Sequence, residues 1–131
     1  MKIKAEVLKL NYKNKNNRVY DEDVVSSIID TVNTTKAFIY QDLVEFNELA
    51  PKDIIGYVDK AYLENDILFV EGEITDSNQI KELIEAVYIH PSGVGSVTDN
   101  GKVFDYTLYA FGLTKESAFD DVISTIKVTE D

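Results

Sequence analysis

Residues 87–119 read VYIHPSGVGSVTDNGKVFDYTLYAFGLTKESAF, and this stretch carries the clearest structural signal of the chain. Residues 87–98 and 102–113 are rich in aromatic and β-branched side chains, as strands are. The triplet Asp99-Asn100-Gly101 between them is a strong turn signal. We therefore predict a β-hairpin here, followed by a turn and loop up to Asp121.

The rest of the chain adds strands on both sides and two helices. Apolar residues alternate, or β-formers cluster, at residues 2–10, 37–40, 54–63, 67–74 and 122–128. Helical spacing of apolar residues behind a capping Asp or Ser predicts helices at 21–33 and 76–87. Residues 41–53, which are acidic and contain Pro51, are predicted to form a surface loop.

This order of elements predicts the fold class. We expect one α+β domain over residues 1–131, a bent mixed sheet or small β-barrel of about six to seven strands with two packed helices. A length of 131 residues supports one core and not two. The chain has no cysteine, no apolar run near 18 residues and no secretory leader, so disulfides, thiol chemistry and membrane insertion are not expected.

Charge is distributed unevenly along the chain. Residues 1–20 contain six Lys and Arg residues and one Glu, while the whole chain has a net charge of −11. We predict an acidic body with one basic arm that carries Lys9, Lys13, Lys15 and Arg18. Nucleic acid is not the expected partner, because phosphate binding needs a concentrated positive patch.

Two groups of motifs resemble those of phage capsid-maturation (prohead) proteases. One group runs from Gly93-Val94-Gly95-Ser96-Val97 through the Asp99 turn to Phe111-Gly112-Leu113 and Ser117-Ala118-Phe119. The other is Asn14-Lys15-Asn16-Asn17-Arg18-Val19-Tyr20 before the first predicted helix. The resemblance implies a prohead-protease-like fold, similar to herpesvirus assemblin, in which Arg18 and Tyr20 order a loop against the sheet.

The same resemblance implies that catalysis has been lost. These proteases need a nucleophilic Ser and a His on another strand, within hydrogen-bonding reach. His90-Pro91 stands where the family keeps its serine pair, and residues 40–46, where the family keeps its His, contain none. His90 is the single His of the chain.

A rearranged site stays open as an alternative. His90 and Ser92 lie two residues apart on a predicted strand, and a kink at Pro91 would bring them together; Ser96 would need Gly93 and Gly95 to fold back. The simpler interpretations are a partly buried histidine at His90 and a bulge or bend at the two glycines.

The sequence therefore favours a catalytically inactive virion protein, a capsid auxiliary or decoration subunit made in the host cytoplasm. Its expected partners are the major capsid protein or other virion proteins, with self-association on the capsid lattice compatible with this role. The basic arm and residues 122–128 are the candidate contact surfaces. The alternatives are an active prohead serine protease that processes scaffold or capsid protein, and a general interaction domain.

No cofactor or metal is expected. The acidic runs Asp21-Glu22-Asp23 and Asp120-Asp121 lack the spacing of a calcium loop. The aromatic residues of the strands are predicted to form the sheet core, because basic residues are not interleaved with them in sequence; they are Tyr57, Tyr62, Phe69, Tyr88, Phe104, Tyr106, Tyr109 and Phe111.

Overall fold

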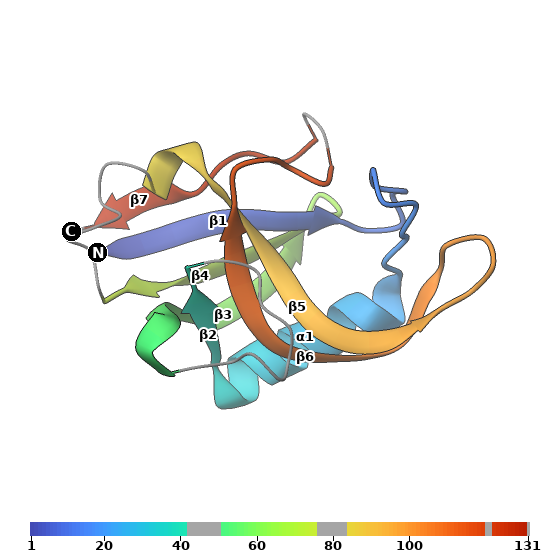
Figure 1. The fold of residues 1–131 in the computed structure, drawn as a ribbon, viewed down its shortest axis with the longest axis horizontal. Helices are drawn as coiled ribbons and strands as arrows, with labels where there is room; N and C mark the ends of the chain where they lie inside the picture. The colour runs from blue at the N-terminus through green and yellow to red at the C-terminus, as the bar shows by residue number, and fades with distance from the viewer. Residues whose placement is uncertain (42–50, 76–83, 120–121, 131) are drawn as a thin grey trace.

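The computed structural model describes residues 1–41, 51–75, 84–119 and 122–130. The strands are β1 (Lys2–Lys9), β2 (Ala37–Tyr40), β3 (Ile54–Glu64), β4 (Ile67–Ile74), β5 (Tyr88–Val97), β6 (Val103–Thr114) and β7 (Lys127–Glu130). These seven strands form one curved sheet in the order β5-β6-β2-β3-β4-β1-β7. Neighbouring strands are antiparallel except for the parallel pair β2 and β6. Figure 1 shows the last strand, β7, beside the first, β1, with which it pairs.

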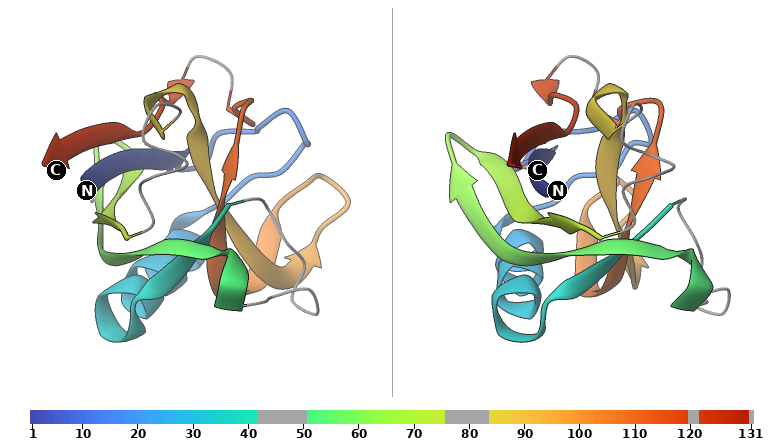
Figure 2. Two further views of the ribbon diagram at one scale, coloured as in Figure 1. Left: turned by 60° about the vertical axis from the view of Figure 1, so that its left-hand side comes forward. Right: turned by 90° about the vertical axis from the view of Figure 1, so that its left-hand side faces the viewer.

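The predicted hairpin of β5 and β6 is confirmed, and β3 and β4 form another one. Asn65 and Asp66, between β3 and β4, both have positive φ, as a tight two-residue turn requires. Gly101 in the second turn has a φ of 95°, and an added Cβ would lie 2.0 Å from the Asn17 carbonyl oxygen. The β5–β6 hairpin is a long curved ribbon whose turn extends away from the rest of the sheet (Figure 2).

The prediction of two packed helices is wrong. The described residues contain one α-helix, α1 (Glu22–Thr35), and two 3-10 turns at Pro51–Asp53 and Ile84–Ala86. Residues 76–83 of the second predicted helix lie outside the described part. Its end is a single 3-10 turn, because the Val87 carbonyl accepts a hydrogen bond from Ile126 N–H at 3.0 Å and β5 begins at the next residue.

Helix α1 begins where its sequence predicts and extends to Thr35, two residues beyond the predicted end at residue 33. Asp21 caps it by accepting a hydrogen bond from Val24 N–H at 3.2 Å. Lys36, with a φ of 62°, ends it and turns the chain into β2. The buried helix residues Val25, Ile28 and Val32 belong to the same core as the inward side chains of the strands.

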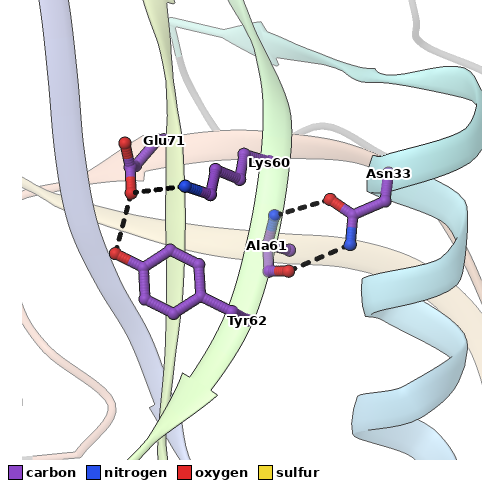
Figure 3. A network of polar contacts seen from close by, with 5 residues as sticks. All are labelled: Asn33, Lys60, Ala61, Tyr62 and Glu71. Atoms are coloured by element: carbon purple, nitrogen blue, oxygen red, sulfur yellow. Dashed lines mark hydrogen bonds and ion pairs between the residues drawn. The ribbon is translucent and has the colours of Figure 1, made fainter.

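A side-chain clamp joins α1 to the sheet. Strand β2 is short and pairs only with the first half of β3, so among the described residues no strand pairs with the far half of β3 on that side. Asn33 of α1 takes its place: its amide donates to the Ala61 carbonyl at 3.0 Å and accepts from Ala61 N–H at 2.9 Å. Figure 3 shows the Asn33–Ala61 pair together with two contacts of Glu71, which accepts a hydrogen bond from the Tyr62 hydroxyl and forms an ion pair with Lys60. The clamp fixes the position of the helix along the strand.

Candidate functional site

His90 lies on β5 opposite Gly112 of β6 and is 9% exposed. Burial lowers the pKa of its imidazole, and a hydrogen bond with the Glu116 backbone only partly opposes this. The imidazole is therefore neutral near pH 7, with one nitrogen able to donate and the other able to accept a hydrogen bond. This is the protonation state that a general base requires.

A cavity of about 310 Å³ adjoins His90. One wall is the loop before α1 and the other is the segment after β6, and Lys15 N–H joins them by donating to the Ala118 carbonyl at 2.8 Å. Asn14, which is buried, holds this loop by accepting hydrogen bonds from the backbone of Asn16 and Arg18. The residues that line the cavity are Leu8, Asn14, Lys15, Asn16, Tyr20, His90, Pro91, Thr114, Glu116, Ser117, Ala118 and Phe119.

The two serines named from the sequence do not line the His90 cavity. Ser92 is 9% exposed and pairs with Ala110. Ser96 is exposed and pairs with Phe104, towards the far end of the hairpin.

A third serine, Ser117, lines this cavity together with His90. It is 8% exposed, and its Oγ accepts a hydrogen bond from Phe119 N–H at 2.9 Å. Sequence reasoning missed it because Ser117 lies 27 positions after His90 and carries no nucleophile motif. Only the return of the chain after β6 brings the two residues to one cavity.

Tyr20 and Gly93 pack around the same ring. Tyr20 lies edge-on against Tyr106, with 6.1 Å between ring centroids. A Cβ on Gly93 would lie 2.3 Å from the Tyr106 ring, so the ring occupies the space that a side chain would need. Register shifts occur at Ser92–Gly93 and between Val94 and Ser96. At each shift the additional residue lies on β6, so the predicted bulge is in the strand opposite the glycines and not in their own strand.

The basic arm does not form one patch. Lys9 lies over the Tyr12 ring, 5.5 Å from its centroid, and Lys15 lines the His90 cavity. Lys13 and Arg18 border a depression that also includes Asp99 of the hairpin turn. The four cations are thus distributed from the end of β1 along the loop before α1, and Asp99 lies beside two of them.

Several aromatic residues lie outside the core, which corrects the sequence-based assignment. Tyr57, Tyr62 and Phe69 are half-buried and lie on the sheet face away from the core residues. Tyr62 and Phe69 stack with centroids 5.6 Å apart. Lys4 lies 4.9 Å from the Phe69 centroid and Lys36 lies 4.7 Å from that of Tyr57. Lysines and rings that are distant in sequence thus alternate on the surface, because neighbouring strands bring them together.

Over the part of the chain that the structure describes, no three His, Asp or Glu side chains are grouped as a metal site would need. No helix within those same residues is long and apolar enough to cross a membrane.

The fold is similar to that of a phage capsid protease. A solved structure of the capsid assembly protease gp21 of bacteriophage T4 superimposes with a TM-score of 0.72, at 17% sequence identity. The match covers 86% of this chain and 79% of that chain. No family model and no curated protein matches the sequence. The resemblance read from the motifs is thereby supported at the level of the fold.

Proposed function

We propose that this chain is a phage head protein that uses the capsid-protease fold to bind the capsid and does not cleave it. One observation carries the proposal: the single His of the chain lies at a cavity that neither Ser92 nor Ser96 lines. A general base must reach the nucleophile's proton directly or through one water. Neither Ser92 nor Ser96 lines the cavity beside the imidazole, and this favours a binding role over catalysis by either pair.

The head as the site of binding is inferred from the fold. The protein with the similar structure is a capsid assembly protease. This chain presents a curved sheet, and the loop before α1 carries Lys13, Lys15 and Arg18. A capsid repeats the same surface many times, so contacts that are weak singly add up across the lattice. The major capsid protein is the expected partner, and the virion is the expected location.

Two measurements test this function. Mass spectrometry of purified particles should find the chain at high copy number. The purified protein should also sediment with assembled heads at low and moderate salt. Absence from particles, together with no co-sedimentation at either salt concentration, would contradict the proposal.

A second candidate function, serine hydrolysis, rests on the cavity that His90 and Ser117 share. A fluorophosphonate probe separates the two functions, since it labels only a serine made nucleophilic by a base. Under the binding proposal the wild type stays unlabelled. Labelling that disappears in Ser117→Ala and persists in Ser92→Ala and Ser96→Ala would establish the hydrolase instead.

A further inference from the structure

The two ends of the sheet differ in charge. β7, at one end, has four residues, and its Glu130 forms an ion pair with Lys2 at 3.5 Å. β5, at the other end, has ten residues, and residues 87–98 contain no Asp, Glu, Lys or Arg. Natural proteins usually protect exposed edge strands with charge, because the unpaired backbone can recruit another strand. β5 lacks that protection.

The edge of β5 is also regular. At both register shifts in the β5–β6 pair the additional residue is on β6: one step from Ser92 to Gly93 corresponds to two steps on β6, from Ala110 to Leu108. Asp105, with a φ of 53°, lies in the second irregularity. The run from Gly93 to Val97 therefore stays extended, and no strand of the described residues pairs with its outer side.

Apolar side chains are exposed beside this edge. Val94 is 55% exposed, Val97 39% and Phe104 40%. Ser96 pairs with Phe104, and Val94 lies two residues before Ser96, so Val94 and Phe104 share one face. An uncharged strand edge and an apolar strip thus occur together at one end of the molecule.

We propose that the Gly93–Val97 edge pairs antiparallel with the same edge of a second copy of this chain, to form a twofold dimer. An antiparallel pair of identical strands is self-complementary, as a closed twofold interface requires. Each copy carries a net charge of −11, so two copies repel each other over most of their surfaces. The uncharged β5 edge is the place where they approach without bringing like charges together. This inference goes beyond the proposed function and does not depend on it.

Sedimentation equilibrium of the full chain, up to about 1 mM, tests the proposal. The wild type should dimerise, and more tightly in about 0.5 M salt than in about 0.05 M, because salt screens the repulsion between the acidic copies. Val94→Glu should weaken the dimer at least about tenfold, since it places like charges across the twofold axis. Circular dichroism and thermal melting should match the wild type, because the Val94 side chain is largely exposed.

Two further measurements sharpen the test. Phe38→Glu is the matched control: Phe38 is 54% exposed but lies on β2, so its dimer should equal that of the wild type. Val94→Lys alone should also weaken the dimer, and an equal mixture of the Glu and Lys variants should recover association. A wild type that stays monomeric at every concentration would overturn the proposal. So would unaltered dimerisation of Val94→Glu, equal weakening by Phe38→Glu, or no recovery in the mixture.

Discussion

At the residue scale, the buried imidazole of His90 makes the stability of the folded protein depend on pH. Burial depresses the pKa of His90, so the unfolded chain takes up a proton at a higher pH than the folded chain does. The contribution of His90 to the free energy of unfolding is fully present above the unfolded-state pKa of about 6.5, and it is lost as the pH falls below that value. The folded state thus tolerates the neutral ring and resists the charged one.

We predict that His90→Gln costs about 1 kcal/mol at pH 7.5, as a typical single substitution does. The difference should shrink or reverse as pH falls from about 7.5 to 5, because the glutamine does not titrate. Thermal melting of both proteins across this range measures it. Parallel curves for the two proteins would show that the imidazole is not desolvated.

Gly93 and Gly95 give a matched pair of substitutions. An added Cβ at Gly93 meets the Tyr106 ring at 2.3 Å and the Thr107 carbonyl at 2.6 Å, whereas at Gly95 the nearest atom is 3.1 Å away. We predict that Gly93→Ala destabilises the protein by about 1–3 kcal/mol, as overpacking does, and that Gly95→Ala costs clearly less. Urea denaturation of both variants measures the difference. Equal losses would mean that Tyr106 does not constrain Gly93.

At the scale of elements, the two hydrogen bonds between the Asn33 side chain and the Ala61 backbone take the place of strand pairing in the far half of β3. Asn33→Ala leaves the Ala61 N–H and carbonyl without this partner, and we predict a loss of about 1–3 kcal/mol for the two bonds. Asn33→Asp keeps the acceptor for Ala61 N–H but turns a second carboxylate oxygen toward the Ala61 carbonyl, so it should also be less stable than the wild type. Chemical denaturation compares the three proteins, and an Asn33→Ala variant as stable as the wild type would refute the clamp.

The loop before α1 is attached to the sheet through Tyr20. Its ring packs against the core and against Tyr106, and its carbonyl accepts a hydrogen bond from Asn11 N–H at 2.8 Å. We predict that Tyr20→Ala costs roughly 2–4 kcal/mol, while Tyr20→Phe keeps most of the packing. A melting temperature within a degree or two of wild type for Tyr20→Ala would show that the loop does not depend on this ring.

For the whole molecule, the separation of charge predicts how the chain associates with heads. Replacing Lys9, Lys13 and Lys15 with Gln should slow association several-fold and flatten its salt dependence, with little change in dissociation. Rim charges act mainly on the rate of encounter, which explains this division. Binding to surface-immobilised particles at two ionic strengths measures both rates.

A control with the same change in net charge is available elsewhere on the surface. Lys36, Lys52 and Lys115 are exposed and lie outside the basic arm, so the triple Gln variant should associate at nearly the wild-type rate. Equal slowing in both variants would indicate that net charge, and not the arm, governs the encounter. Unchanged association in the arm variant would place the contact surface elsewhere.

The sequence alone determined helix α1 and most of the strands, because these signals are short in range; the second predicted helix was wrong. Asp21 marks the start of α1, and alternating residues mark the strands. Asn65 and Asp66 adopt the positive φ values of their turn because Asn and Asp tolerate this backbone conformation better than most residues. The motif order also led to the capsid-protease fold that the T4 structure supports.

The tertiary structure decided everything that depends on residues distant in the chain. It brought Ser117, and not Ser92, to the cavity of His90, because the segment after β6 returns to the start of β5. It placed Tyr57 on the outer face, since a sheet has two faces and strand pairing selects which is buried. It placed β5 at the end of the sheet. Packing over the whole core sets the order of the strands, and local β-propensity does not predict that order.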